Sequence, residues 1–437
     1  MASATFEQPG TDDVFYTWCA QKDALPFEIA GGEGARFLTS DGGWWLDFGS
    51  VTWNANLGHG HPEMRRRLAA AASEGLLAMP AADFPAKRAA ARALLSVAPQ
   101  GLSDGKVFFC LSGAEANENA VKMARLLTGR RKVIYRDRSY HGATLAMLSY
   151  SGDPRRTPFE PGMPDGIPWA DPYTTGAHPG DLERLLEREG ASQVAAVLLE
   201  GVVGANGVFV PPPGYFRRIR EICDRAGVLL IVDEVLSGFG RTGRWFAIDH
   251  DGVTPDLLTC AKGLTGGYVP GGAVVVARRH AHFFDDHVLS CGLTSYAHPL
   301  TCAGIAAAID VYRSESLVER AAALGPKLGG ALRDLTASRP FVREVRGLGF
   351  LWAVDLGEPG SSGAVGGGSP TPTLPPAAPA RMAALARALR EARLYLHKRD
   401  NLVFVAPPLM IPEETLLEGV SLLGRCLDAC FATGGAP

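Results

Sequence analysis

The chain has 437 residues, of which 46% are hydrophobic and 20% charged, a balance typical of a globular protein of two or three domains. The formal net charge is −3, and no hydrophobic stretch has the length of a membrane span, which argues against nucleic-acid and membrane partners and favours small molecules. Because no basic segment precedes a hydrophobic one at the N-terminus, we expect a cytoplasmic protein. The eight cysteines never form Cys-x-x-Cys, so neither a metal site nor a disulfide framework is expected.

The first part of the chain predicts a small antiparallel region, with short strand-like runs at Ala35–Leu38 and Trp44–Phe48 between glycine-rich turns. From residue 57 to about 318, strand-like segments alternate with helical patterns such as Ala114–Leu127 and Gly214–Ala226. Such alternation predicts right-handed crossovers and a mostly parallel sheet. The strand-like segments are Lys106–Cys110, Val133–Tyr135, Val194–Leu199, Val228–Val232, Leu257–Cys260 and Gly272–Val276.

The last third predicts a second, smaller α+β unit. Its expected helices are Ala322–Ala337, Pro379–Ala392 and Pro412–Ala432, and its expected strands are Val342–Val345, Leu351–Val354 and Leu402–Val405. A segment rich in Gly, Ser and Pro at 357–379 cannot bury a core and predicts a flexible loop. We therefore expect an α/β fold with a large domain at 57–318 and a small domain made of 1–56 and 319–437.

Two adjacent carboxylates, Asp233 and Glu234, follow the hydrophobic run at 228–232. A fully hydrophobic strand belongs in a sheet covered on both faces, and an ionised side chain at its end needs a partner cation. The next segment, Gly238-Phe-Gly-Arg-Thr-Gly243, matches the glycine pattern of dinucleotide sites, but residues 244–255 have no helical periodicity. A dinucleotide site is therefore disfavoured, and the partner of Asp233 must be sought elsewhere.

Ser112 and Gly113 lie where the strand-like segment at 106–111 meets a helical segment. Serine is a good helix cap, glycine lets a ligand approach the backbone, and the free N–H groups of a helix start attract an anion. Taken alone, this pattern is more typical of an ordinary capped helix. Whether it binds an anion therefore depends on the residues at the neighbouring strand ends.

Two further strand ends carry an aromatic ring and an amine. Tyr140 follows the strand at 133–135, and Lys262 follows the strand at 257–260. Most lysines lie on the surface. Ala261 and Gly263 flank this one after a hydrophobic strand, however, which favours a half-buried amine at the edge of the sheet.

An anion-binding helix start, an aromatic face, a carboxylate and an amine are the four groups that pyridoxal 5'-phosphate (PLP) requires. The helix start would hold the phosphate, and Tyr140 would stack on the ring. Asp233 would pair with the pyridinium nitrogen, which makes the ring an electron sink, and Lys262 would form the Schiff base. Asp233 thereby gains the cation that it needs. Glu234 is interpreted as structural.

The same residues lie in motifs that resemble those of the class III aminotransferases, PLP enzymes of fold type I, over nearly the whole chain. The motifs are Leu57-Gly-His-Gly-His-Pro62, Ser112-Gly-Ala-Glu-Ala-Asn117, Tyr140-His-Gly142, Asp233-Glu-Val235, Gly238-Phe-Gly-Arg-Thr-Gly243, Ala261-Lys-Gly263, Thr294 with His298-Pro299, and Ala406-Pro-Pro-Leu409. The resemblance implies a large domain with a seven-stranded type of sheet and a homodimer. It also makes the turn that holds His59 and His61 structural rather than metal-binding.

Carried over by position, the resemblance implies that Lys262, Asp233 and Tyr140 are catalytic, with Lys262 also moving the proton. The residues that it implies for cofactor binding are Ser112, Gly113, Ala114, Tyr140, His141, Glu200, Asp233, Val235, Lys262 and Thr294. Tyr140 and Val235 would cover the two faces of the ring, and Thr294 would reach the phosphate of the neighbouring subunit.

The segments Phe15–Gln21 and Arg138–Thr144 look most like the branch that contains taurine–pyruvate and related ω-aminotransferases. In that branch Trp18 and Trp53 would line the substrate pocket. The alternative for each tryptophan is an ordinary buried core aromatic.

Three positions depart from the family pattern. Glu200 is followed by glycine instead of proline, and Ala114 replaces a hydroxyl residue, which removes one side-chain donor to the phosphate. His397 occupies the position where many ω-aminotransferases have an arginine that binds a substrate carboxylate. Histidine lacks the two-pronged guanidinium, so we expect a substrate without an ordinary α-carboxylate at this point, unless Lys398 or Arg399 turns inward.

These observations predict a PLP-dependent aminotransferase that moves an amino group between a terminal primary amine and a keto acid or aldehyde by ping-pong chemistry. One alternative is another reaction of the same carbanion, such as elimination, replacement or carbon–carbon bond formation, because fold and cofactor do not fix its fate. A binding protein without catalysis is a further alternative, although Asp233, Tyr140 and Lys262 are all present.

Overall fold

Seven strands form the central sheet of the computed structural model, which describes residues 13–159, 165–175, 181–357 and 376–431. In spatial order they are β4 (Lys106–Cys110), β10 (Gly272–Val276), β9 (Leu257–Ala261), β8 (Leu229–Asp233), β7 (Val194–Glu200), β5 (Lys132–Arg136) and β6 (Gly166–Trp169). Only β10 runs antiparallel to its neighbours within this sheet. The predicted mostly parallel α/β architecture is therefore confirmed.

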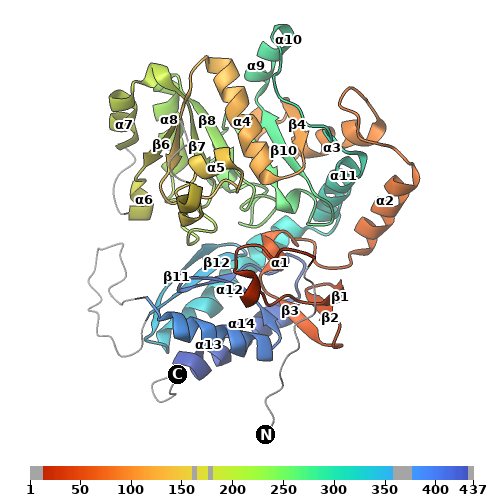
Figure 1. Cartoon of the computed structure of the whole chain (residues 1–437), viewed down its shortest axis with the longest axis vertical. Helices are drawn as coiled ribbons and strands as arrows, with labels where there is room; N and C mark the ends of the chain where they lie inside the picture. The colour runs from red at the N-terminus through yellow and green to blue at the C-terminus, as the bar shows by residue number, and fades with distance from the viewer. Residues whose placement is uncertain (1–12, 160–164, 176–180, 358–375, 432–437) are drawn as a thin grey trace.

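Helices cover both faces of this sheet, which explains why its strands are continuous hydrophobic runs. All seven residues of β7 are buried. Helix α4 (Gly113–Thr128) packs on one face with alternate strand residues such as Ile231 and Val274. Helices α8 (Tyr215–Ala226) and α11 (Pro299–Ser314) share the hydrophobic core of the opposite face. The carboxyl ends of β4, β9, β8, β7 and β5 therefore meet at one edge (Figure 1).

Two smaller sheets occupy the lower part of the view in Figure 1. One contains β1 (Ile29–Glu33), β2 (Arg36–Thr39), β3 (Trp44–Asp47) and β13 (Leu394–Tyr395). The other contains β11 (Val342–Leu348), β12 (Leu351–Leu356), β15 (Leu402–Val405) and β14 (His397–Arg399). Because β13 pairs with β3, the N-terminal strands and the last third of the chain share one sheet. Helices α12 (Leu317–Ala337), α13 (Pro379–Glu391) and α14 (Glu413–Phe431) accompany them.

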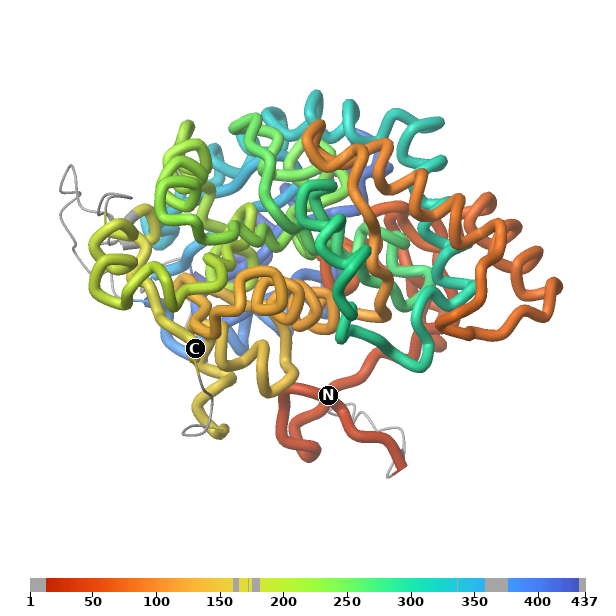
Figure 2. Tube along the Cα trace, turned by 90° about the horizontal axis from the view of Figure 1, so that it is seen from above, coloured from red at the N-terminus to blue at the C-terminus, as the bar shows by residue number. Residues whose placement is uncertain are grey.

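The remaining helices are short or peripheral. They are α1 (Ser50–Trp53), α2 (Pro62–Ser73), α3 (Pro85–Leu95), α5 (Leu145–Ser149), α6 (Pro172–Thr175), α7 (Asp181–Glu189), α9 (Arg278–Ala281) and α10 (Phe283–Asp286). Figures 1 and 2 both place α2 and α3 at the opposite end of the molecule from α7 and α8. Within the described ranges, no helix combines the length and the hydrophobicity needed to cross a membrane.

Differences between predicted and observed elements have local causes. The helix predicted from Gly214 begins at Tyr215, because Gly214 has a φ of 82° and caps the helix from the left-handed region. Strands β1, β6, β13 and β14 were not predicted. The expected loop at 357–379 lies largely outside the described residues. The domain boundaries at 56/57 and 318/319 stay predictions.

Candidate active site

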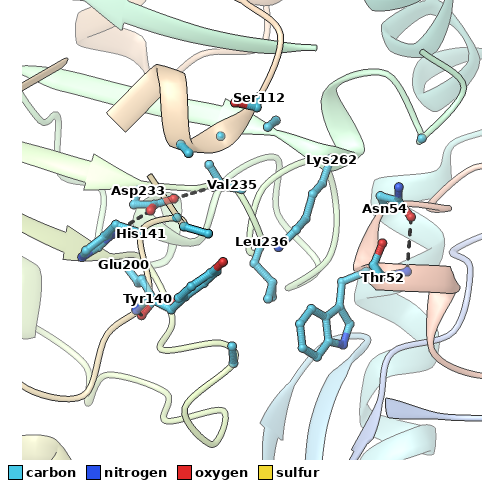
Figure 3. A pocket seen from close by; sticks show the side chains of 18 of the residues that line it. Thr52, Asn54, Ser112, Tyr140, His141, Glu200, Asp233, Val235, Leu236 and Lys262 are labelled. Atoms are coloured by element: carbon cyan, nitrogen blue, oxygen red, sulfur yellow. Dashed lines mark hydrogen bonds and ion pairs between the residues drawn. The ribbon is translucent and has the colours of Figure 1, made fainter. Parts of the chain in front are cut away.

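A cavity of about 870 Å³ lies at the edge of the sheet where the strand ends meet. Twelve of the thirteen predicted site residues line it: Trp18, Trp53, Ser112, Gly113, Ala114, Tyr140, His141, Glu200, Asp233, Val235, Lys262 and His397. In Figure 3, Lys262 extends into the pocket opposite Tyr140, and Asp233 lies deeper between His141 and Val235. Thr294 is exposed and does not line this cavity.

The Asp233 carboxylate is almost fully buried and is held by three donors. Its Oδ2 lies 2.7 Å from His141 Nδ1 and accepts a hydrogen bond of 2.7 Å from Asn117 Nδ2, and its Oδ1 accepts one of 2.9 Å from the Val235 amide. Thr259 Oγ1 donates to Asn117 Oδ1 at 2.6 Å, which fixes the orientation of the amide. A buried carboxylate with this support stays oriented toward a cationic partner in the pocket.

Asn117 is a site residue that the sequence reasoning missed, although it lies in one of the motifs quoted above. It belongs to the second turn of α4, so the helix that begins beside the predicted phosphate position also holds the carboxylate. His141 Nε2 is buried and has no hydrogen-bond partner among the described residues.

Lys262 follows the buried strand β9 with a φ of 46°, in the left-handed region that is unusual for residues other than glycine. Burial lowers the pKa of its amine to about 8, although the nearby Asp233 and Glu200 carboxylates oppose this change. The amine nitrogen lies 5.4 Å from the centroid of the Trp53 ring. A lysine with this pKa is about one-tenth neutral at pH 7, far more than an ordinary lysine, and the neutral amine is the nucleophilic form.

The start of α4 offers backbone groups for an anion. Ser112 Oγ accepts a hydrogen bond of 3.2 Å from the Glu115 amide, so this side chain caps the helix. The amides of Gly113 and Ala114 donate to no group within the described residues. A Cβ on Gly113 would lie 2.8 Å from Val235, so only glycine lets that valine pack beside the helix start. The missing hydroxyl at Ala114 therefore leaves the backbone donors in place.

The Tyr140 ring is covered on one side by a guanidinium that the sequence reasoning also missed. The Arg155 guanidinium lies 3.7 Å from the Tyr140 centroid and 4.8 Å from the Trp18 centroid. Two of its nitrogens, Nε and Nη2, donate to the Asp153 carboxylate at 2.8 and 2.9 Å. Its Nη1 donates no hydrogen bond within the described residues, and Arg155 lines the cavity.

Glu200, at the end of β7, binds two backbone amides. Its carboxylate accepts hydrogen bonds of 3.1 Å from Tyr140 and 2.9 Å from Gly204, and burial raises its pKa. A Cβ at Gly201 would lie 2.6 Å from a Glu234 oxygen, so the glycine that replaces the usual proline leaves room for that carboxylate. Burial raises the pKa of Glu234 to about 7, and its contacts with Ser237 and the Ile248 amide agree with a structural role.

His397 lines the cavity, but its ring is already engaged. His397 Nε2 donates to the carbonyl of Val51, and burial lowers the pKa of the imidazole, which favours the neutral form. The same turn contains Ser50, Val51 and Trp53 with φ values of 46°, 55° and 61°. The buried Asp47 carboxylate accepts a hydrogen bond of 3.0 Å from the Val51 amide. The Trp53 ring lies 4.5 Å from the His397 ring.

Lys398 and Arg399, the two cationic residues that follow His397, differ in exposure and in hydrogen bonding. Lys398 is exposed at the cavity wall. Arg399 turns inward, and its Nη1 donates to Asp153 Oδ2 at 2.7 Å, to Asn206 Oδ1 at 3.0 Å and to the Ala205 carbonyl at 3.2 Å.

The glycine-rich segment Gly238–Gly243 does not begin a helix, and the next helical element is the 3-10 helix η5 (Ala247–His250). Its Arg241 is fully buried and donates to the Pro407 carbonyl at 2.6 Å and to Ser50 Oγ at 3.1 Å. The segment thus joins the large sheet to the smaller unit.

Comparisons with known proteins agree with this geometry. The family model described as aminotransferase class-III matches residues 18–427. The chain is 33% identical to an acetylornithine aminotransferase of Methanothermobacter thermautotrophicus, over 92% of this chain and 94% of the relative. It is also 33% identical to an omega-aminotransferase of Caulobacter vibrioides, over 90% of this chain and 93% of that protein.

Among solved structures, the taurine:2-oxoglutarate aminotransferase of Bifidobacterium kashiwanohense, determined with PLP and glutamate, superposes with a TM-score of 0.87. It is 33% identical in sequence, and the match covers 95% of each chain. The buried carboxylate, the amine and the helix start of the cavity are the donor set that PLP requires. The chain therefore belongs to the class III aminotransferases, enzymes of PLP fold type I that transfer amino groups with PLP as cofactor.

Proposed function

We propose that this aminotransferase takes its amino group from a terminal primary amine whose far end carries an acidic group. When bound, PLP supplies an electron sink for the carbon that bears the amino group. Lys262 would bind the cofactor covalently and move the proton at that carbon, and the Asp233 carboxylate would pair with the ring nitrogen. The free amides at Gly113 and Ala114 would hold the phosphate together with Ser112.

The two faces of the cofactor ring are assigned to Tyr140 and Val235. Since Arg155 already covers one side of Tyr140, the tyrosine has its other side for the cofactor. His141 and Glu200 act behind these groups, because His141 holds the Asp233 carboxylate and Glu200 holds the Tyr140 amide.

The proposal of an acidic group on the substrate rests on the position and the free nitrogen of Arg155. Its guanidinium is fixed by Asp153 and lies between the Tyr140 and Trp18 rings, while its Nη1 has no partner among the described residues. A guanidinium in that state binds a carboxylate or sulfonate well. Trp18 and Trp53 form walls of the pocket. Because the His397 ring already binds the Val51 carbonyl, Arg155 is the residue proposed to bind the acidic group.

A panel of amino donors tests the substrate proposal. Compounds with a terminal amine and a distal acid should convert the bound cofactor to its amine form and yield an aldehyde or keto product with a keto acid as acceptor. The alternative use of the carbanion, in elimination, replacement or carbon–carbon bond formation, would instead give product without accumulation of the amine form. Strong preference for alanine over all terminal amines would refute the proposed donor class.

The cofactor assignment has its own test. Purified enzyme should be yellow and retain the cofactor covalently after borohydride reduction, whereas Lys262→Ala should not form this covalent link. Reducible attachment of the cofactor in Lys262→Ala would overturn the role of this lysine.

The proposed assembly is a cytoplasmic homodimer in which Thr294 completes the phosphate site of the partner. Leu77 and Val288, which are 85% and 82% exposed in the single chain, are candidate contacts of the second copy. Sedimentation should give the dimer mass. Thr294→Val should weaken PLP binding, and a monomer that is fully active would refute the shared site.

A further inference from the structure

A buried carboxylate outside the predicted site joins two arginines of the pocket. Asp153 follows α5, and its side chain is fully buried. It accepts two hydrogen bonds from the Arg155 guanidinium, one of 2.9 Å from the Arg155 amide and one of 2.7 Å from Arg399 Nη1. Although burial opposes ionisation, these hydrogen bonds from Arg155 and Arg399 lower the pKa of Asp153 to about 2. The carboxylate is therefore ionised over the whole physiological range.

The two arginines differ in the groups that they leave free. Arg399 Nη1 is shared among Asp153, Asn206 and the Ala205 carbonyl, and its Nε lies 3.8 Å from the Asp400 carboxylate, whereas its Nη2 donates no hydrogen bond within the described residues. Arg155 uses Nε and Nη2 for Asp153 and keeps Nη1. One carboxylate faces two guanidinium groups, so one positive charge within this trio is left for a ligand.

Asp153 also fixes where that positive charge lies. A free arginine side chain has many rotamers, and the planar guanidinium binds an acid well only when its edge is presented correctly. The two-pronged bond to Asp153 sets the plane of Arg155 so that it stacks 3.7 Å from the Tyr140 centroid. Arg399 comes from β14 of the smaller unit and holds Asp153 from the other side.

We propose that Asp153 is a specificity-determining positioning residue, which orients Arg155 for the acidic end of the substrate through a contact shared with Arg399. This inference rests on the proposed function, in which Arg155 binds that acid. Asp153 touches neither substrate nor cofactor. Its effect should therefore appear in the affinity for acid-bearing donors rather than in the rate of amino transfer.

The test compares Asp153→Asn with the unmodified holoenzyme on 3-aminopropanoate and 1-aminopropane, two donors that differ in the acid. Asparagine keeps the size of the side chain but cannot accept the two-pronged bond in the same way. We expect KM for 3-aminopropanoate to rise about tenfold while kcat stays within about twofold, and kcat/KM for 1-aminopropane to change less than twofold. An unchanged KM would overturn the inference. A lower KM would also overturn it, because it would mean that Asp153 acts only by cancelling positive charge.

Arg155→Gln separates this inference from the proposed function. If Arg155→Gln leaves KM for 3-aminopropanoate unchanged, the proposed acid contact is wrong. If Arg155→Gln raises KM and Asp153→Asn does not, the acid contact stands and only the positioning role fails.

Should Asp153→Asn not fold, as judged by its melting temperature and cofactor absorbance, Arg399→Gln decides. This variant removes the second donor to Asp153 without touching Arg155. A rise of about threefold in KM for 3-aminopropanoate, with kcat retained, supports the shared contact, and no change overturns it.

Discussion

Replacement of Lys262 by methionine should stabilise the cofactor-free enzyme near neutral pH even though it abolishes activity. Burial lowers the pKa of Lys262 to about 8, so the protonated amine is less favourable in the folded protein than in the unfolded chain. The difference between the ordinary lysine value of 10.5 and about 8 corresponds to about 3 kcal/mol of unfolding free energy. Methionine is similar in length, has no charge to bury, and should remove this cost.

The sign of the pH dependence follows from proton binding. Below about pH 8 the amine is protonated in both states, and the cost is complete. Between about pH 8 and 10.5 the unfolded chain binds more protons than the folded protein, so the unmodified enzyme gains stability as the pH rises. The advantage of Lys262→Met should therefore be greatest at pH 7 and shrink steadily toward pH 10.

Urea unfolding of the two cofactor-free proteins, at equal protein concentration and at several pH values, measures this difference. Lys122→Met, on the exposed side of α4, is the control and should change the unfolding free energy by less than about 0.5 kcal/mol. Equal stability of Lys262→Met and the unmodified protein at pH 7 would refute the reasoning. So would an advantage that does not depend on pH.

Three further substitutions probe the site. Gly142→Ala should weaken PLP binding about tenfold, measured by cofactor titration, because its Cβ would lie 2.5 Å from that of Ala114, whereas Gly75→Ala, also at positive φ but in open space, should leave binding unchanged. Asn117→Ala should lower the unfolding free energy by about 2 kcal/mol, since it removes a hydrogen bond to the buried Asp233 carboxylate, and an unchanged urea midpoint would contradict this. His397→Arg should raise turnover with alanine or glutamate relative to a terminal amine. The same variant should melt at a lower temperature because the bond to the Val51 carbonyl is lost. Unchanged turnover with alanine and glutamate would contradict the first expectation, and an unchanged melting temperature would contradict the second.

Much of the site was predictable because its main groups directly follow buried hydrophobic strands. Asp233 ends β8 and Lys262 follows β9, so the pattern that predicts the strands also brings these side chains to one edge. The quoted glycines precede or flank these groups and are visible as sequence motifs. Because these strands run parallel, the residues at their carboxyl ends lie at the same edge of the sheet.

The missed features depend on contacts that no local pattern records. Arg155 lies in a loop without periodicity, and its role emerges only when Tyr140 and Asp153 are seen around it. Strand β14 consists of His397-Lys-Arg399, which has no hydrophobic alternation, and it forms because β15 pairs with it. The His397 ring binds the carbonyl of Val51, 346 residues away in the sequence. Such partners follow from the tertiary fold rather than from spacing.

The strained turn next to His397 couples the substrate range of this enzyme to its thermal stability. Three of the four residues at positions 50–53, namely Ser50, Val51 and Trp53, have a positive φ, and such residues cost about 1–3 kcal/mol each. Asp47 and His397 hold the turn in place through Val51, and Trp53 at the end of the turn lines the pocket. A substitution of His397 that admits new amines therefore also removes one of the contacts that hold this strained turn in place. Variants selected for a wider range of amines at this corner should need compensating mutations elsewhere before they tolerate heat or solvent.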